Sequence, residues 1–262
     1  MTIPREGEIW KLAVEPLGAQ PLRSGHPSVL LQGILPILRG SFGPATHSSA
    51  QMPFKFVLFD AFGTLLQIPQ GRHPYRQILK EGMRQGRRPQ PDDLRQILTR
   101  NLNLAEAAEL FGIKIQSAHM ADIEGDLEAD LQSIEAFEDG LRAVEMLQTK
   151  GIKIAVASNL AAPYARPIRR LYPTVDAYGF SFALGAMKPE PFFYRGTCEL
   201  LGADTSYYSC GDNVAMIGDS EKCDRDGPNA VGIPGFLLNR QGGKDFSSLS
   251  EFSDMVLSCK RQ

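Results

Sequence analysis

From residue 54 onward, short apolar runs alternate with amphipathic stretches, which predicts an α/β fold with a parallel sheet flanked by helices. Three of the runs are typical of buried strands: 54–59, 152–157 and 214–217. A helical pattern precedes the second strand. This helix is expected to end at Lys150 and Gly151, because a glycine suits a left-handed helix C-cap.

More than ninety residues separate the first two predicted strands, and most of them follow a helical pattern. Apolar residues recur there at helical spacing, namely Leu94, Ile97, Leu98, Leu102, Leu104, Ala107, Leu110 and Phe111. This stretch is too long for an ordinary crossover connection. It predicts an inserted helical cap domain at about residues 67–136, above the carboxyl ends of the strands, where ligands bind in open α/β sheets. Residues 52–66 and 137–262 would then form the core domain.

The start of the chain has a different character. Residues 1–51 hold six of the eighteen prolines and six glycines without sustained periodicity, so they are expected to form an irregular extension. Because a predicted strand begins within two residues of Met52, one hypothesis is that Met52 is the natural start and that the preceding residues are upstream sequence or a dispensable leader. Mass spectrometry of the N-terminus of the native protein tests this hypothesis.

Composition and charge narrow the range of partners. The 262 residues carry a formal net charge of −2, and this value does not suggest binding to nucleic acid or to an anionic membrane surface. We expect a small-molecule substrate. We also expect the protein to be a monomer or a homodimer. The apolar run at 29–38 is too short and interrupted to span a bilayer, and it lacks the position of a secretory signal. The four cysteines lack metal-finger spacing and are expected to be reduced, so a cytoplasmic protein is predicted.

Candidate chemistry begins with Asp60, which directly follows the first predicted strand and precedes a turn that contains Gly63. Such a position exposes a carboxylate while successive backbone N–H groups of the turn can converge on an anion. Asp60 is therefore a candidate nucleophile. The alternative is that Asp60 only caps the turn.

Three further segments carry polar residues beside predicted strands or turns. Ser158 and Asn159 end the second strand and can hydrogen-bond substrate oxygens, although the pair is also ordinary turn chemistry. Lys188 stands in Lys-Pro-Glu-Pro, a rigid turn that can present a fixed ammonium group, although most lysines are simply solvated. Asp219 and Asp224 follow the third strand and supply the oxygen ligands that Mg²⁺ prefers.

A fourth aspartate, Asp212, precedes the third strand and is expected to be a turn residue. It is not placed in the candidate site.

Taken in order, the four segments read Asp-x-x-Gly-Thr-Leu, Ser-Asn, Lys-Pro-Glu-Pro and Gly-Asp-Ser-x-x-x-Asp-x-x-Gly. This series closely resembles the four motifs of the haloacid dehalogenase superfamily, over about residues 54–240. We call the segments the first motif (60–65), the second motif (158–159), the third motif (188–191) and the fourth motif (218–227). The resemblance implies a Rossmann-like three-layer core with a helical cap, and catalysis through a covalent aspartyl intermediate.

The same resemblance implies roles for residues of these motifs. Asp60 would be the nucleophile, Thr64 and Ser158 would orient substrate oxygens, and Lys188 would stabilise developing charge. The substrate-binding set is completed by Asn159, Phe62 and Gly63.

The resemblance also implies a metal site. Asp219 and Asp224 would form its acidic corner, Asp60 would be a third carboxylate ligand, and the backbone carbonyl of Phe62 would be a further ligand. The expected ion is Mg²⁺.

Phe62 departs from the pattern of the superfamily's ordinary phosphatases, which have a second aspartate two residues after the nucleophile. That aspartate protonates the leaving alkoxide and then activates water, and a phenylalanine transfers no protons. An aromatic residue at this position resembles the 2-haloacid dehalogenases, which release halide without a proton. Ser158, Asn159 and Tyr194 match those enzymes as well, but they also match many phosphatases.

The fourth motif favours the opposite conclusion. Two carboxylates beside the nucleophile repel each other and an anionic substrate unless a cation intervenes, so Asp219 with Asp224 indicates Mg²⁺ and a phosphorylated substrate. Dehalogenases work without metal and use a cap arginine to hold the substrate. The candidates for that arginine are Arg72, Arg76, Arg84, Arg87 and Arg88.

Three hypotheses follow. The leading one is a Mg²⁺-dependent phosphohydrolase of a small phosphorylated metabolite, with an activated leaving group or a proton supplied by the cap or the substrate. The second is a metal-independent 2-haloacid dehalogenase. The third is a low-activity protein that binds a phosphorylated ligand or a protein partner. Chelation separates the first two, and the third predicts ligand-induced thermal stabilisation without product.

Overall fold

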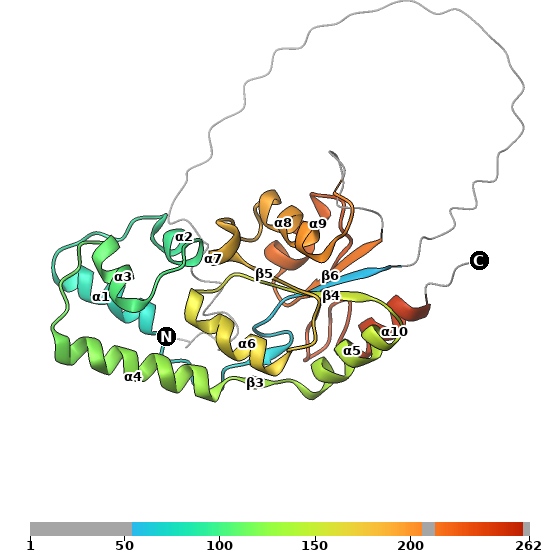
Figure 1. Ribbon diagram of the computed structural model, residues 1–262, viewed down its shortest axis with the longest axis horizontal. Helices are drawn as coiled ribbons and strands as arrows, with labels where there is room; N and C mark the ends of the chain where they lie inside the picture. The colour runs from blue at the N-terminus through green and yellow to red at the C-terminus, as the bar shows by residue number, and fades with distance from the viewer. Residues whose placement is uncertain (1–53, 206–212, 259–262) are drawn as a thin grey trace, which may run out of the picture. The chain divides into compact units, whose positions relative to one another are not determined.

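The computed structural model describes residues 54–205 and 213–258 (Figure 1). The predicted extension at 1–51, Met52 and Asp212 lie outside the described residues, as do Cys210 and Cys259. No helix within the described ranges is long and apolar enough to cross a membrane.

A five-stranded parallel sheet forms the centre of the described chain, in the order β5-β4-β1-β6-β7. The strands are β1 (Phe56–Phe59), β4 (Lys153–Ser158), β5 (Ala177–Phe180), β6 (Val214–Gly218) and β7 (Gly235–Leu237). In the register, Phe59 at the end of β1 pairs with Val156 on one side and Ile217 on the other. The carboxyl ends of these three strands therefore lie side by side, and the residues that follow them meet at one edge of the sheet.

The three predicted strands are confirmed, with bounds shifted by one or two residues. The sequence did not predict β5 and β7, which have four and three residues. β5 contains Gly179, a residue type that usually weakens a strand. Here the glycine makes room for a helix, because a Cβ at Gly179 would lie 2.1 Å from Oγ1 of Thr197.

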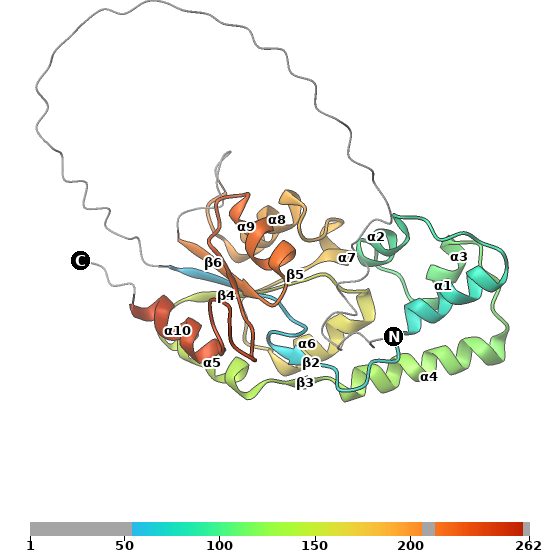
Figure 2. The same ribbon diagram turned by 180° about the vertical axis from the view of Figure 1, so that it is seen from behind.

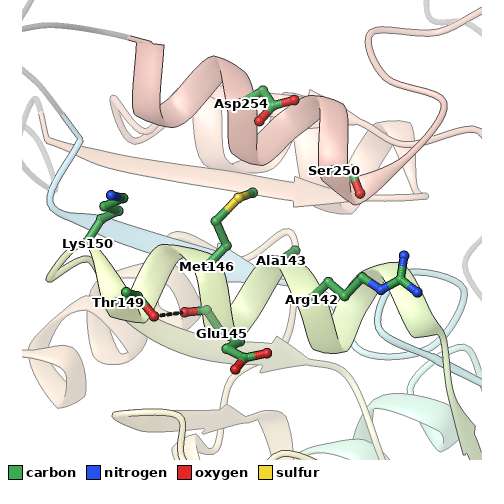
Figure 3. A pocket seen from close by; sticks show the side chains of 8 residues that line it. All are labelled: Arg142, Ala143, Glu145, Met146, Thr149, Lys150, Ser250 and Asp254. Atoms are coloured by element: carbon green, nitrogen blue, oxygen red, sulfur yellow. Dashed lines mark hydrogen bonds between the residues drawn. The ribbon is translucent and has the colours of Figure 1, made fainter.

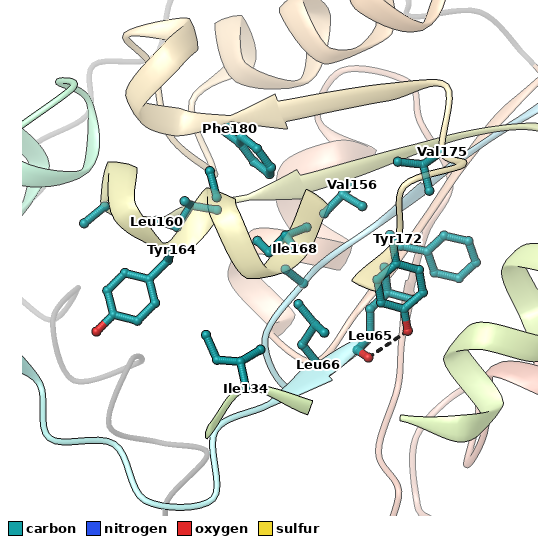
Figure 4. Close-up of a cluster of buried hydrophobic side chains, with 14 of the residues drawn as sticks. Leu65, Leu66, Ile134, Val156, Leu160, Tyr164, Ile168, Tyr172, Val175 and Phe180 are labelled. Atoms are coloured by element: carbon teal, nitrogen blue, oxygen red, sulfur yellow. Dashed lines mark hydrogen bonds between the residues drawn. The ribbon is translucent and has the colours of Figure 1, made fainter. Parts of the chain in front are cut away.

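The sheet is buried on both faces, so alternate side chains of each strand enter two different cores. Val57 and Phe59 of β1 belong to one buried cluster, whereas Leu58 belongs to the other. Figures 1 and 2 show α8 and α9 on one side of the sheet and α5, α6 and α10 on the other. Figure 4 shows part of the larger cluster, where Ile168 of α6 lies near Leu66 and Val156. The result is the three-layer α/β arrangement that the sequence predicts.

Several helices of the core have ends that the sequence explains. The helices are α5 (Glu138–Thr149), α6 (Ala165–Leu171), α7 (Ser181–Leu184), α8 (Pro191–Leu201), α9 (Gly227–Asn229) and α10 (Leu249–Ser258), with the short helices η3 (Ala162–Tyr164) and η4 (Glu221–Asp226). α5 ends next to Lys150, and Gly151 has a φ of 79°, which confirms the predicted left-handed position. α8 begins at Pro191, whose fixed φ suits the first helical position.

Four helices lie between the short strands β2 (Leu66–Gln67) and β3 (Glu135–Ala136), which pair antiparallel. They are α1 (Pro74–Arg84), α2 (Asp93–Leu98), α3 (Leu104–Leu110) and α4 (Ser117–Ser133). We call residues 68–134 the helical insert. α3 starts with a capping box, in which Asn103 and Glu106 each accept a backbone N–H of the other at 2.8 Å. A helical insert is therefore present between the first two predicted strands, as the sequence indicates.

Candidate active site

Asp60 lies at the carboxyl end of β1, directly after its last residue. Its backbone N–H donates to the carbonyl of Ile217 in the neighbouring β6 at 3.0 Å, which continues the sheet pairing by one residue. Only 7% of Asp60 is exposed. The carboxylate is therefore fixed at the edge where three strands end.

The first motif then makes a tight turn. The backbone N–H groups of Leu65 and Leu66 both donate to the carbonyl of Ala61 at 2.8 Å. Gly63 adopts a φ of 87°, in the region that favours glycine. A Cβ at Gly63 would lie 2.7 Å from Oδ2 of Asp219, so this glycine lets the turn approach the fourth motif.

Within the turn, Thr64 is fully buried, and its hydroxyl donates to Oδ2 of Asp60 over a long 3.5 Å. The structure thus brings together the two first-motif side chains to which the sequence assigns chemistry.

Lys188 connects the third motif to the other motifs. Its Nζ lies 2.6 Å from Oδ1 of Asp60 and 2.7 Å from Oδ1 of Asp224, and its side chain is 3% exposed. The main chain of Lys188 is held by Asn159, whose amide oxygen accepts its N–H at 2.8 Å and whose amide nitrogen donates to its carbonyl at 2.9 Å. Asn159 therefore orients Lys188, a role that the sequence did not assign to it.

Asp224, from the fourth motif, contacts the same ammonium group as Asp60. Asp224 is 1% exposed, and its Oδ2 accepts the backbone N–H of Ser220 at 2.8 Å. A Cβ at Gly218 would lie 2.3 Å from Oδ2 of Asp224, so a glycine is required at the end of β6. The hydroxyl of Tyr194 donates to the carbonyl of Cys223 at 2.6 Å and so supports the short helix that carries Asp224.

The carboxylates of Asp60, Asp219 and Asp224 come together at the strand ends. One oxygen from each lies within 4.8 Å of the others, a spacing at which one ion can contact all three. Oxygen donors of this kind suit hard divalent cations. The donor set therefore fits the Mg²⁺ that the sequence predicts.

Burial sets the electrostatics of this group. Burial, with the neighbouring carboxylates of Asp224 and Asp219, raises the pKa of Asp60 to about 7, although Lys188 opposes the shift. Burial by itself would lower the pKa of Lys188, but the carboxylates of Asp224 and Asp60 outweigh it and raise that pKa above its ordinary value. Lys188 is thus held charged, and a further cation near Asp60 would favour its ionised form.

Phe62 is half-buried at the position where the resemblance expects an acid. Its ring meets that of Tyr164 edge to face, with centroids 6.1 Å apart. The Tyr164 hydroxyl donates at 2.9 Å to Oδ2 of Asp130, a buried residue of α4 in the helical insert. Burial and the Asp130 carboxylate raise the pKa of Tyr164 above its ordinary value, so its hydroxyl is a poor acid.

Ser158, the other predicted substrate residue, ends β4 and is 2% exposed. Three of the predicted cap arginines are paired with acidic residues of the insert: Arg72 with Asp126, Arg84 with Glu81, and Arg87 with Asp93.

A different arginine of the insert reaches the core motifs. Arg95 of α2 forms a two-point ion pair with Glu190 of the third motif, with Nε–Oε1 at 2.8 Å and Nη2–Oε2 at 3.1 Å. The sequence does not single out Arg95, because nothing local distinguishes it from the other arginines of the insert.

A pocket elsewhere on the core lies between α5 and α10 (Figure 3). No residue of the four motifs lines it. It is separate from the candidate active site.

Comparison with known proteins agrees with this geometry. Residues 54–232 match the model of the family described as haloacid dehalogenase-like hydrolase. The chain belongs to this family. It is therefore a hydrolase of the phosphatase or dehalogenase type, as the four motifs predict.

Three individual proteins that resemble this chain share 19% to 26% sequence identity with it. Phosphatase MT3486 from Mycobacterium tuberculosis is 26% identical over 130 residues, which make up 46% of this chain and 57% of that protein. The match thus spans little more than half the length of this curated relative. Among solved structures, a haloacid dehalogenase-like (HAD) phosphatase from Thermococcus onnurineus has a TM-score of 0.52 at 23% identity, covering 80% of this chain and 100% of the other. A 2-haloacid dehalogenase from Pseudomonas syringae has a TM-score of 0.54 at 19% identity, covering 78% and 98%. Both likenesses show the fold.

Proposed function

We propose that this protein is a Mg²⁺-dependent phosphohydrolase that acts on a small phosphorylated molecule through a covalent intermediate on Asp60. The observation that carries the proposal is the carboxylate group of Asp60, Asp219 and Asp224, with ligand atoms within 4.8 Å of one another. The ammonium of Lys188 contacts two of the three carboxylates, and a divalent cation would bring further positive charge to the group. A metal-independent dehalogenase does not need three carboxylates gathered in this way.

The metal site would consist of carboxylate oxygens from Asp60, Asp219 and Asp224, with the backbone carbonyl of Phe62 as a further ligand. Bound Mg²⁺ supplies Lewis-acid polarisation of a phosphoryl oxygen and neutralises its charge.

In the proposed reaction, a carboxylate oxygen of Asp60 attacks phosphorus while the bond from phosphorus to the leaving oxygen breaks. Water then hydrolyses the aspartyl phosphate, which releases inorganic phosphate and restores the carboxylate. Lys188, at 2.6 Å from Asp60, is placed to stabilise negative charge on the transferring group, and Thr64 and Ser158 are proposed to bind its oxygens.

Phe62 narrows the substrate class. It gives no proton to the leaving group, and Tyr164, the aromatic partner of Phe62, holds its proton in a hydrogen bond to Asp130. The proposed substrates therefore have leaving groups that depart as stable anions, such as acyl or aryl phosphates, or carry their own acid.

We also infer that residues 67–136 form the cap that selects the substrate, over a core of 52–66 and 137–262. Arg95 and Glu190 are well placed to hold that cap against the third motif.

The test is a turnover screen of the purified protein against phosphorylated metabolites, aryl phosphates and 2-haloacids, each with Mg²⁺ and with chelator. We expect phosphate release that requires Mg²⁺ and is abolished in Asp60→Asn. An Asp219→Asn variant should need more Mg²⁺ for half-maximal rate, because it loses a charged ligand.

The alternative function is a 2-haloacid dehalogenase, which the aromatic side chain at Phe62 favours. Halide release that is unaffected by chelator would replace the phosphatase proposal with this alternative. Ligand-induced thermal stabilisation without any product would favour the binding-protein hypothesis instead.

A further inference from the structure

Arg240 follows β7 by three residues and lies outside the four motifs, yet it contacts the first of them. Its Nη2 donates to the backbone carbonyl of Thr64 at 2.8 Å. Its Nη1 forms an ion pair with Oδ2 of Asp139 at 2.8 Å. The guanidinium also stacks over the ring of Phe137, with Cζ 3.8 Å from the ring centroid.

The side chain of Thr64, like that of Lys188, contacts the proposed nucleophile, since the Thr64 hydroxyl donates to Oδ2 of Asp60 at 3.5 Å. The bond from Arg240 fixes the other end of the same residue. A guanidinium–carbonyl bond is charge-assisted and therefore stronger than a neutral one. Arg240 thus acts on the turn that carries one of the hydrogen-bond donors to the Asp60 carboxylate.

The other two partners lie where the chain returns from the helical insert. Phe137 directly follows β3, and Asp139 lies in the first turn of α5. The Phe137 N–H donates to the carbonyl of Leu65 at 2.9 Å. The Tyr172 hydroxyl donates to that same carbonyl at 2.9 Å (Figure 4). The first motif and the start of α5 are therefore tied to each other, and Arg240 contacts both.

Asp139 is itself well anchored. Its Oδ2 also accepts the backbone N–H of Leu249 at the start of α10, at 2.9 Å. Burial alone would raise the pKa of Asp139, but the hydrogen bonds from Arg240 and Leu249 outweigh it and hold the pKa below its ordinary value. The side chains of Arg240 and Asp139 are only 29% and 20% exposed, so the pair is screened by water less than a surface ion pair.

We propose that Arg240 is a positioning residue, which holds the Thr64 backbone against the start of α5 and thereby helps to aim Asp60 at the substrate. This inference rests on the proposed function only in taking Asp60 as the nucleophile. The positioning role requires the planar guanidinium group of arginine, because this one group contacts a carbonyl, a carboxylate and an aromatic face together. Lysine, a point charge, satisfies one of these partners at a time.

The test compares Arg240→Met, Arg240→Lys and the control Arg142→Met in the full chain. Arg142 lies on α5 and pairs with Glu138 at an exposed site, with 70% of its side chain exposed, so its loss removes an arginine without touching the first motif. Turnover is measured well below the lowest Tm of the set. We expect Arg240→Met to lower kcat about 10- to 100-fold with KM within about threefold, the effect of misplacing a reacting group. Arg240→Lys should recover part of the rate, and Arg142→Met should match the wild type.

A second measurement is independent of turnover. Hydrogen exchange of the backbone amides at 63–66 reports on the turn, because these amides donate within it. Exchange there should be faster in Arg240→Met than in Arg142→Met. An unchanged kcat, or an unchanged exchange rate at 63–66, would overturn the inference. If the wild type hydrolyses no phosphate ester but exchange at 63–66 rises in Arg240→Met, the positioning role stands while the phosphatase proposal fails.

Discussion

Replacing Lys188 by methionine removes a buried charge from the centre of the candidate site while keeping most of the side-chain volume. Lys188 contacts Asp60 at 2.6 Å and Asp224 at 2.7 Å, and the side chains of the three residues are 3%, 10% and 1% exposed. Removing one partner of a buried charge pair typically costs about 3–5 kcal/mol, because the remaining charge is left uncompensated. Two carboxylates lose their partner here, so a cost in this range is expected.

For a folded unit of about 200 residues, each kcal/mol lowers Tm by about 2–4 °C, so Lys188→Met should melt about 6–20 °C below the wild type in the presence of chelator. Mg²⁺ should recover more Tm in the variant than in the wild type, because removing a neighbouring ammonium strengthens cation binding by Asp60, Asp219 and Asp224. Phosphate turnover should nevertheless fall about 10²- to 10³-fold, since a donor to the developing charge is lost.

The measurement is a thermal melt with chelator and with a Mg²⁺ titration, alongside the exposed control Lys150→Met. The control should melt with the wild type. The reasoning fails if Lys188→Met melts within about 2 °C of the wild type in chelator. It also fails if Mg²⁺ shifts the variant less than the wild type, because the carboxylates would then not share one cation.

Three further predictions concern the fourth motif, the insert and the missing acid. Gly218→Ala should abolish the Mg²⁺-induced rise in Tm and lower turnover at least about tenfold, because its Cβ would lie 2.3 Å from the Asp224 carboxylate; an unaltered Mg²⁺ titration would contradict this. Asp93→Ala should cost about 3 kcal/mol in urea unfolding at pH 7, since Asp93 accepts 2.6 and 2.5 Å bonds from Arg87. The hydrogen bonds from Arg87 hold the pKa of Asp93 below its ordinary value, so this contribution is present above the ordinary pKa of an aspartate and is lost as pH falls through the folded-state pKa. A difference between variant and wild type that grows in acid would refute this prediction. Phe62→Asp should raise the turnover of alkyl phosphates by about 10²-fold or more and should change the turnover of aryl phosphates far less. Equal increases in turnover for the two substrate classes would show that the chain does not lack a proton donor for the leaving group.

Three residues of the candidate site could be placed from the sequence, because each lies at or just after the end of an apolar strand. In a parallel sheet, successive strand ends meet at one edge, so a pattern of runs and polar termini is enough to bring Asp60, Ser158 and Asp219 together. The short strands β5 and β7 left no such pattern. Three or four residues give too few alternations to separate a strand from a turn.

The residues that orient the reacting groups could not be predicted in the same way. Asn159 holds the main chain of Lys188, Tyr194 holds the carbonyl of Cys223, and Arg240 holds that of Thr64. In each case a side chain meets a backbone atom that is remote in sequence, by 29, 29 and 176 positions respectively. Backbone carbonyls and amides carry no residue identity, so a single sequence contains no complementary pattern by which such partners could be recognised.

The contacts between Phe62 and the residues around it restrict which side chain is favoured at position 62. Its ring lies against Tyr164, whose hydroxyl is bonded to Asp130, and Asp130 also accepts the backbone N–H of Arg72 at 2.8 Å where the insert begins. An acid at position 62 would replace this apolar contact with a charge facing an aromatic ring. The arrangement therefore favours an uncharged side chain at position 62. Under the proposed function, this arrangement predicts that bonds which break without a proton are cleaved and that ordinary alkyl phosphates are spared.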